Sequence, residues 1–315
     1  MSTELLNRIS AELRLPLAEM ETAVRLGSSR MRKLSFAKKN GERRIAYQAA
    51  ATVKPILHWL RVNPLACLPV SPVATAFRKQ ASTVINAKAH RNSLYSVRID
   101  IQNFFPSITK ADIQKLVMSS ASLLEAGWNP EQVSDLIGHV CFDRRGRLPI
   151  GFSTSPDLAN AVMYELDSTL LQSLANTDRF GYSVLTRYAD DFVFSTDRRG
   201  ACAEFLEHFR KCLDASKSPS LKINEEKTRF MSRGGGSTII TGLRITNQAA
   251  VRVHADYRDH VRLLLRLYAQ DRLSREEHVK LAGHLAYIES ADPKLFTRLS
   301  FKYSDQISAI RCGVP

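Results

Sequence analysis

Three aspartates in the sequence stand where their carboxylates could bind metal ions together. Asp190 and Asp191 are adjacent and lie between two apolar runs, and Asp100 ends a third apolar run. Each of these runs predicts a short buried strand. A polar turn with both adjacent aspartates in water is the simpler explanation, because neighbouring carboxylates repel each other and resist burial. Three carboxylates at the ends of neighbouring strands instead favour a site for two divalent cations, which activate an attacking hydroxyl and neutralise a leaving pyrophosphate.

The other potential metal ligands are scattered along the chain. The five cysteines form no C-x-x-C pair, and the eight histidines form no H-x-x-x-H group. This spacing disfavours both a zinc site and a disulfide framework, and it is typical of a protein in a reducing cytoplasm. Carboxylates would therefore hold any catalytic metal, which indicates a hard ion such as Mg²⁺.

The charge of the chain favours a polyanionic partner. Its 315 residues include 45 Lys and Arg against 31 Asp and Glu, a formal net charge of +14. A surplus of this size is typical of proteins that bind nucleic acid. The sequence has no long apolar run and no basic-then-apolar N-terminus, so we expect neither a membrane span nor a secretory signal. We expect a cytoplasmic protein of two or three packed units.

The apolar pattern predicts intermixed helices and strands without strict alternation, which favours the α+β class. The expected helices follow Thr3, run from Pro16 to Gly27, and cover 108–119, 130–141, 155–174 and 200–213. The expected strands cover 94–101, 182–188, 192–195, 221–223, 229–231 and 238–245. From Asp256 onward the chain turns helical and basic, and the shift near Val253 marks a candidate domain boundary.

A basic hairpin is expected near the N-terminus. Asn40-Gly41 stands between two alternating runs, and both residues tolerate the positive φ that a two-residue turn requires. The hairpin carries five cations: Lys33, Lys38, Lys39, Arg43 and Arg44. It is either a flap for an anionic ligand or a solvated edge with protective lysines.

Several blocks of the sequence, taken in order, resemble those of reverse transcriptases. These blocks are Asp100-Ile-Gln-Asn-Phe-Phe105, Leu148-Pro-Ile-Gly-Phe-Ser-Thr-Ser-Pro156, Tyr188-Ala-Asp-Asp191, Leu221-Lys-Ile-Asn-Glu-Glu-Lys227 and Ile240-Thr-Gly-Leu243. The bacterial retron type is the most similar, because Asn86-Ala-Lys-Ala-His90 matches its N-A-x-x-H block and Ile240-Thr-Gly242 is similar to its V-T-G triplet. The resemblance implies a right-hand polymerase fold. Its expected parts are N-terminal helices and fingers (1–93), a palm (94–250) with inserted fingers elements (108–155), and a helical basic thumb (251–315).

The resemblance also implies roles for single residues at a nucleotide site. Asp100, Asp190 and Asp191 would hold two Mg²⁺ ions, with the Ile101 carbonyl as a further oxygen ligand. The remaining expected contacts to the incoming nucleotide are Arg44, Lys39 as a weaker second choice, Asn103, Phe105, Gly151 and Lys227. A bulky ring at Phe105 would exclude a ribose 2′-OH and so select deoxynucleotides. Without the resemblance, Phe105 would be interpreted as a core aromatic and Lys227 as an exposed lysine.

A second set of expected roles concerns the primer and the RNA. Gly242 and Leu243 would contact the primer strand, where glycine permits close backbone approach. Asn86, His90 and Thr241 would contact structured RNA in this family, although an Asn and a His on one helix face are commonly just exposed to solvent.

The sequence departs from the family pattern at two positions beside Gly151. Ile150 stands where most reverse transcriptases have a Gln that contacts the nucleotide, and Phe152 replaces a small residue. Both changes predict a more apolar nucleotide pocket.

The resemblance implies RNA-templated DNA synthesis. For a retron it further implies that one folded non-coding RNA is both template and primer, that synthesis starts from a guanosine 2′-OH, and that the product is a branched RNA–DNA molecule (msDNA). An effector protein would complete an anti-phage system, and another protein would supply RNase H, because no block of four spaced carboxylates follows the expected thumb.

Two alternatives remain open from the sequence. The first is a non-catalytic RNA-binding scaffold with a polymerase fold. The second is another bacterial reverse transcriptase, either diversity-generating or similar to an intron maturase, which normally carries a further region. The 62 residues after Val253 suffice for a thumb and little else, which favours the retron interpretation.

Overall fold

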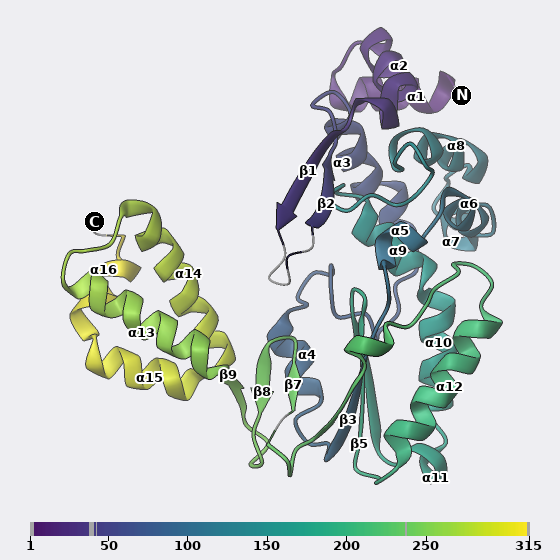
Figure 1. Cartoon of the computed structure of the whole chain (residues 1–315). Coiled ribbons are helices and arrows are strands. Elements are labelled where there is room, and N and C mark those ends of the chain that lie inside the picture. Colours follow the sequence, from purple (N-terminus) through teal and green to yellow (C-terminus); the bar gives the residue numbers. More distant parts are fainter. Residues whose placement is uncertain (1–2, 38–40, 42, 237, 314–315) are drawn as a thin grey trace.

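The structure is a computed structural model that describes residues 3–37, 41, 43–236 and 238–313. Its nine strands are β1 Arg32–Ala37, β2 Arg43–Gln48, β3 Tyr95–Asp100, β4 Ser183–Tyr188, β5 Asp191–Thr196, β6 Arg229–Ser232, β7 Ile239–Ile240, β8 Leu243–Ile245 and β9 Val251–Val253 in these described ranges. The helices before β4 are α1 Thr3–Leu13, α2 Leu17–Leu26, α3 Lys54–Val62, α4 Thr83–Ala89, α5 Phe104–Ser107, α6 Lys110–Met118, α7 Ala121–Glu125, α8 Pro130–Val140, α9 Ser155–Val162, α10 Tyr164–Ser173 and α11 Thr177–Phe180. The helices after β5 are α12 Ala201–Ala215, α13 Ala255–Ala269, α14 Arg275–Ala291, α15 Pro293–Lys302 and α16 Ser304–Arg311. Figure 1 shows their arrangement.

A four-stranded antiparallel sheet forms the centre of the molecule, in the order β4-β5-β3-β6. Helices α10 and α12 lie along one side of it (Figure 1). The rings of Phe194 on β5 and Phe205 on α12 stack at 4.1 Å, and Phe192 meets Phe209 edge to face at 4.9 Å. These aromatic pairs fix α12 against β5, because large rings bury much apolar area in a defined geometry.

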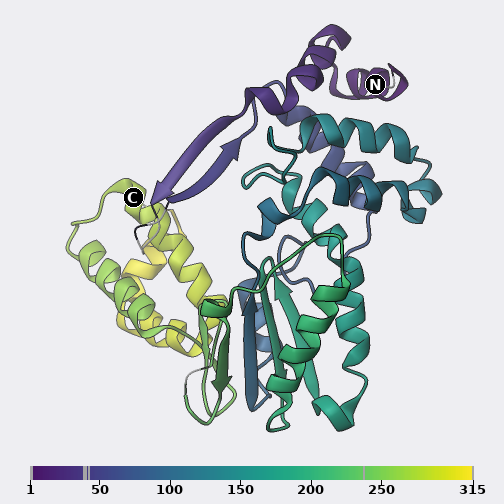
Figure 2. The ribbon, with the colours of Figure 1, turned by 45° about the vertical axis from the view of Figure 1, so that its right-hand side comes forward.

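A second, smaller core lies on the other side of the central sheet. It joins α4, the three-stranded sheet β7-β8-β9 and the C-terminal helices α13–α16. Val193 of β5 belongs to this core, so β5 contributes side chains to both faces. Figure 2 shows α13–α16 on the opposite side of the central sheet from α12.

The N-terminal hairpin is confirmed in its described part. β1 and β2 pair antiparallel, with Phe36 opposite Arg44, and most of their side chains are exposed. The hairpin projects from the N-terminal helices (Figure 2). The expected turn residue Asn40 and the cations Lys38 and Lys39 lie outside the described residues.

Three expectations about secondary structure were wrong. The helix expected over 155–174 is two helices, α9 and α10, which break at Met163; one apolar stripe continues across the break, so the periodicity indicated a single helix. The strand expected at 221–223 makes only one isolated bridge, between Ile223 and Ile101. The strand expected over 238–245 is the tight hairpin β7–β8, because Thr241 and Gly242 adopt positive φ values of 46° and 81°.

Candidate active site

The central sheet brings the three aspartates to one of its ends. Asp100 ends β3 and lies directly opposite Asp191, the first residue of β5. Asp190 precedes it in the two-residue turn between β4 and β5, where Ala189 adopts a left-handed φ of 58°. The backbone N–H of Ile101 donates to the Asp190 carbonyl at 3.0 Å, which ties the turn to the end of β3. The predicted convergence of strand ends is therefore what the fold produces.

Two cationic side chains, Lys227 and Arg98, form ion pairs with the aspartates. The Lys227 ammonium lies 3.1 and 3.3 Å from the two carboxylate oxygens of Asp100, whose side chain is 5% exposed. The Arg98 guanidinium lies 3.0 Å from Asp191. The segment after α12 places Lys227 here, because the N–H of Asn224 donates to the Asp100 carbonyl at 2.8 Å and a short turn of helix follows.

The electrostatics of the site oppose ionisation. Burial raises the pKa of Asp190 and of Asp191 above the ordinary aspartate value, and the negative charge of Asp100 raises the pKa of both further. The guanidinium of Arg98 lowers the pKa of Asp191, and Lys227 acts in the same direction on both. Carboxylates that resist ionisation in the protein alone gain from a divalent cation, because the cation supplies the missing counter-charge.

The donor atoms suit a hard cation. Besides the three carboxylates, the Ile101 carbonyl accepts no hydrogen bond from any residue that the structure describes. Oxygen ligands of this kind are those that Mg²⁺ prefers. Within the described ranges, however, no three Asp, Glu, His or Cys side chains are gathered closely enough to hold an ion as they stand. In this arrangement Lys227 occupies both carboxylate oxygens of Asp100.

Phe105, five residues after Asp100, lies in an aromatic group. Its ring is half-buried and meets Phe104 edge to face at 5.3 Å and Phe77 at 6.2 Å. Phe77 is 46% exposed, so the group presents an aromatic surface to solvent. Asn103, two residues before Phe105, is exposed and adopts a left-handed φ of 50°. Phe105 is thus partly exposed and packs against two other aromatic rings.

Gly151 joins the hairpin to the centre of the molecule. Its φ is +106°, and a Cβ there would lie 2.6 Å from the Tyr47 carbonyl oxygen, so the close approach requires glycine. The Tyr47 N–H donates to the Ile150 carbonyl at 2.7 Å. Arg44 is exposed on β2, and Lys39 lies outside the described residues. The expectation for Phe152 was wrong: its side chain is 3% exposed and packs in the main core, so it makes no pocket wall.

A cavity of about 600 Å³ lies between the hairpin and the loop 143–150. Its walls include Ile45, Tyr47 and Ile150, and its cations are Lys33, Arg144, Arg145 and Arg147. Arg144 donates to the Ser29 carbonyl at 2.8 Å, and none of the four cations forms an ion pair with a carboxylate that the structure describes. Concave surfaces with apolar walls and cationic rims suit a nucleic-acid strand.

Of the two residues expected to contact the primer, Gly242 is exposed and Leu243 is buried. Gly242 lies at the β7–β8 turn, and no atom lies within 4 Å of the position of a Cβ. The Thr241 hydroxyl donates to the Thr83 carbonyl on α4 at 2.9 Å. The Leu243 side chain is buried in the second core, so only its backbone can meet a primer.

Asn86 and His90 are not on the surface. Asn86 is fully buried and His90 is 1% exposed, so neither side chain lies on a solvent-exposed helix face. Their polar atoms meet the hydroxyls of Thr75 and Thr186 instead. Direct contact of these two side chains with RNA does not fit this arrangement, because both are buried and meet the two threonine hydroxyls.

Three residues in or next to the site were not expected from the sequence: Arg98, Arg187 and Phe77. Arg98 stands two residues before Asp100, hence on the same face of β3, and this spacing was a usable signal. Arg187 is a charged residue inside an apolar strand, and it is fully buried against Asp167. No local signal indicated Phe77.

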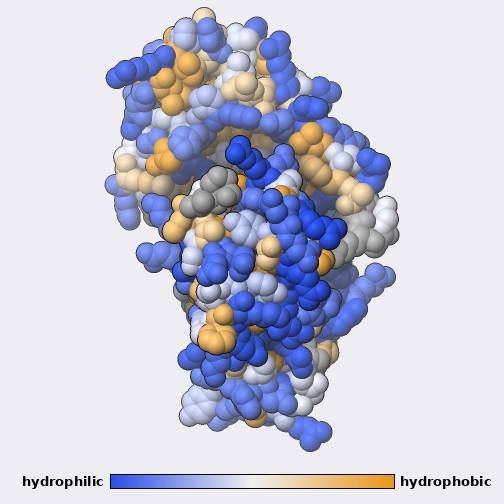
Figure 3. Space-filling model, turned by 90° about the vertical axis from the view of Figure 1, so that its left-hand side faces the viewer, coloured by the Kyte–Doolittle hydropathy of each residue, from blue (hydrophilic) through white to orange (hydrophobic). Residues whose placement is uncertain are grey.

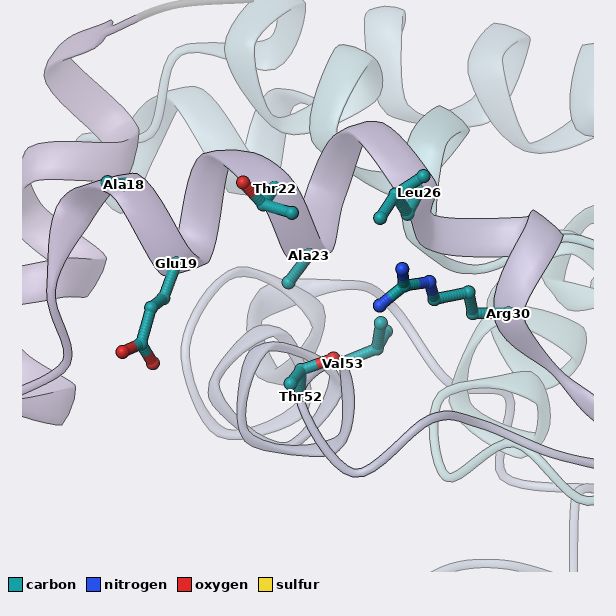
Figure 4. Close-up of a pocket in the computed structure, with 8 residues that line it drawn as sticks. All are labelled: Ala18, Glu19, Thr22, Ala23, Leu26, Arg30, Thr52 and Val53. Carbon is teal, nitrogen blue, oxygen red and sulfur yellow. The ribbon is translucent and has the colours of Figure 1, made fainter.

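Two further surface features lie away from the aspartates. A cavity of about 330 Å³ lies between α2 and the segment before α3, lined by Leu26, Arg30, Val53 and neighbouring residues (Figure 4). None of its lining residues belongs to the site. The side of the molecule on which α13–α16 lie is mostly hydrophilic (Figure 3). Among the described residues, no helix is both long and apolar enough to cross a membrane.

A family model described as reverse transcriptase (RNA-dependent DNA polymerase) matches residues 37–283. The chain therefore belongs to the reverse transcriptase family, and it has the right-hand polymerase fold. Apo telomerase from Candida tropicalis shares that fold, with a TM-score of 0.53 at 11% identity over 88% of this chain and 58% of the telomerase chain.

Within the family the chain is similar to retron enzymes. It is 36% identical to the retron Ec73 reverse transcriptase of Escherichia coli, over 89% of each chain. It is 29% identical to the retron Mx65 reverse transcriptase of Myxococcus xanthus, over 84% of this chain and 62% of that protein. It is 27% identical to the retron Ec86 reverse transcriptase of Escherichia coli, over 93% of this chain and 87% of that protein. It is thus an RNA-directed DNA polymerase of the retron type, and RNA is its template.

Proposed function

We propose that the protein extends a primer hydroxyl with deoxynucleotides at the end of the central sheet, using two Mg²⁺ ions. The observation that carries this proposal is the register of β3 and β5, which sets Asp100 opposite Asp191 with Asp190 one residue away. Asp100, Asp190, Asp191 and the Ile101 carbonyl would hold the ions. When bound, these ions lower the pKa of the primer hydroxyl and neutralise the charge of the leaving pyrophosphate.

The other residues of the site bind and orient the nucleotide. Lys227, once released from Asp100, is a mobile positive charge for the triphosphate, since its side chain is 58% exposed. Arg44 and Lys39 on the hairpin would bind the same phosphates. Phe105 would lie under the sugar and exclude a 2′-OH, and Asn103 and Gly151 would complete the nucleotide contacts.

RNA would be bound on both sides of the nucleotide. The cavity lined by Lys33, Arg144, Arg145 and Arg147 suits the single-stranded template, because its cations can contact successive phosphates. Gly242 and the Leu243 backbone would contact the primer, and Thr241 would contact the structured RNA. The division into fingers (1–93 and 108–155), palm (94–250) and thumb (251–315) assigns these roles to separate parts, and the thumb would hold the duplex by its phosphates and A-form shape.

The similarity to retron enzymes supports a more specific reaction. Template and primer would lie in one structured non-coding RNA, synthesis would begin at a guanosine 2′-OH, and the product would be msDNA. We place the reaction in the cytoplasm, with an effector protein in anti-phage defence and RNase H from another protein.

Two experiments test the proposal: sequencing of the nucleic acid bound to the purified protein, and dNTP incorporation by the wild type. Purification of the full chain from its own cells, followed by sequencing of the nucleic acid bound to it, should yield a short DNA covalently joined to RNA. DNA without that branch would indicate a different reverse transcriptase, such as a diversity-generating or maturase-like enzyme. RNA alone, together with no dNTP incorporation by the wild type, would indicate a non-catalytic scaffold.

A further inference from the structure

The buried residues Asn86 and His90 lie on and just after α4, behind the strand that leads into the catalytic turn. We propose that they are positioning residues, which hold β4 and thereby the Ala189-Asp190 turn through the hydroxyls of Thr75 and Thr186. This inference rests on the proposed polymerase site. It assigns a role within the protein to two residues that the sequence predicted to contact RNA.

Asn86 acts through Thr75. The Thr75 hydroxyl lies 2.9 Å from the Asn86 amide oxygen and 3.1 Å from the Arg187 carbonyl, so it can donate to either. The backbone of the same segment pairs with β4: the Thr75 N–H donates to the Arg187 carbonyl at 2.8 Å, and the Arg187 N–H donates to the Val73 carbonyl at 2.7 Å. Asn86 thus fixes the segment that lies along the edge of β4.

His90 acts on the preceding residue of β4. Its Nε2 lies 2.7 Å from the Thr186 hydroxyl, in a place where both residues are buried. Burial lowers the pKa of His90 to about 3, so the ring is neutral and keeps one donor and one acceptor. Two adjacent residues of β4, Thr186 and Arg187, are therefore held from the α4 side.

Arg187 links β4 to the Ala189-Asp190 turn through side-chain hydrogen bonds. Its guanidinium is fully buried and binds both oxygens of Asp167, at 2.7 to 3.1 Å. The remaining nitrogen lies 3.1 Å from the Asn160 amide oxygen and 3.3 Å from the Ala189 carbonyl. Ala189 is the residue with positive φ that immediately precedes Asp190. A shift of β4 would therefore move this hydrogen bond and the turn together.

The same helix also holds the β7–β8 turn. The Thr241 hydroxyl donates to the Thr83 carbonyl in the first turn of α4. One short helix thus contacts both the strand that carries the catalytic turn and the turn proposed for the primer. Asn86 Nδ2 and His90 Nδ1 have no partner among the described residues, although unpaired buried polar atoms cost free energy. The hydrogen bonds of Asn86 Oδ1 and His90 Nε2 must therefore stabilise the fold enough to offset that cost.

The test separates positioning from RNA contact by substituting the hydroxyl partners, of which Thr75 is half-buried and Thr186 is buried. Thr75→Val and Thr186→Val remove each hydroxyl at nearly constant volume, and Thr75→Ser and Thr186→Ser retain it. Single-nucleotide incorporation on a preformed RNA template and DNA primer gives kcat and KM, and filter binding gives the Kd for the RNA. Lys88→Ala, an exposed change on α4, is the control.

We expect both Val variants, and also Asn86→Ala and His90→Ala, to lower kcat roughly 10- to 100-fold, because small misplacements of catalytic groups have effects of this size. The Kd for RNA should stay within twofold, and the Ser variants should recover most of kcat. Hydrogen–deuterium exchange of the 188–191 segment should rise in the Val variants and not in the Ser variants.

Two results would overturn the inference. One is a Kd that rises at least tenfold in Asn86→Ala and His90→Ala while both Val variants behave as wild type. The other is wild-type kcat in every folded variant. If Asn86→Ala or His90→Ala fails to fold, the Thr pairs decide alone. Failure of the proposed function is distinguishable, because the wild type would then incorporate no nucleotide.

Discussion

The end of the central sheet and the N-terminal hairpin are built in opposite ways. At the sheet end, β3, β5 and the segment 222–227 are joined by backbone hydrogen bonds and two ion pairs around largely buried aspartates. The hairpin exposes most of its side chains and is joined to the centre through the Tyr47–Ile150 hydrogen bond and the close approach at Gly151. The aspartates and Lys227 thus lie on a fixed frame, whereas Arg44, which is proposed to bind the nucleotide phosphates, lies on an exposed arm formed by the hairpin. Catalysis requires reacting groups that are held in fixed positions, whereas closing on a nucleotide requires a segment that can move.

We expect the stability of the frame to depend most on the buried ion pair between Asp167 and Arg187. Asp167→Ala leaves the Arg187 guanidinium buried without its bidentate partner, a change that typically costs about 3–5 kcal/mol. Urea denaturation measures the loss. The control is Asp157→Ala, which removes the more exposed pair with Arg61 and should cost about 0–1 kcal/mol. Equal losses would contradict the view that the frame depends on this buried pair.

The junction between frame and arm should break at Gly151. Gly151→Ala imposes a left-handed backbone on alanine, at about 1–3 kcal/mol, and pushes against the Tyr47 carbonyl. We expect KM for dNTP to rise more than kcat falls, because the hairpin moves and the aspartates do not. Gly127→Ala is the control, since Gly127 has a similar φ of +78° and open space around it. Steady-state kinetics of both variants decide the matter, and an unchanged KM in Gly151→Ala would contradict the role of the junction.

The cations beside the arm should act on affinity and leave the chemistry intact. Arg145→Ala and Arg147→Ala should each weaken binding of single-stranded RNA and reduce the slope of log K against log salt by about 0.7. Arg198→Ala, a change at the other end of β5 where Arg198 pairs with Glu204, should leave the slope unchanged. Fluorescence anisotropy at several salt concentrations measures this. A loss of kcat with no change in affinity would show that these arginines belong to the frame.

The smallest expected effect concerns pH. The ionised aspartates bind metal, so activity falls as the pH drops through their pKa values. Because burial raises the pKa of Asp190 and Asp191 in the metal-free protein, this loss should begin, at limiting Mg²⁺, at a higher pH than for ordinary aspartates near 4. The metal-free protein should show the opposite trend for these two groups: their ionisation lowers its stability as the pH rises through the raised pKa values. Metal-free Asp190→Asn should therefore melt no lower than the wild type at neutral pH, and a clearly lower melting temperature would contradict this assignment.

The frame was more predictable from the sequence than its contacts. The apolar runs that end at Asp100 and flank Asp190 predict the strands, since strand periodicity is local. They also place the aspartates at the ends of those strands. The pairing of Lys227 with Asp100 joins residues 127 positions apart, and no local pattern contains that information. Asn86 and His90 were expected to contact RNA, and no local pattern showed that both side chains are buried. Helical spacing shows that two residues share a face, and only the tertiary packing of α4 on β4 decides what that face meets.

We propose above that the aspartates at the sheet end bind the catalytic metal ions. Single-nucleotide incorporation by Asp190→Asn, on an RNA template with a DNA primer, tests it most directly. Asp178→Asn, an exposed change on α11, is the matched control. Metal clamps of this kind supply several kcal/mol, so the account predicts a loss of at least roughly 10³-fold, and it predicts that Mg²⁺ raises the melting temperature of the control more than that of Asp190→Asn. Near-wild-type incorporation by Asp190→Asn would contradict the account.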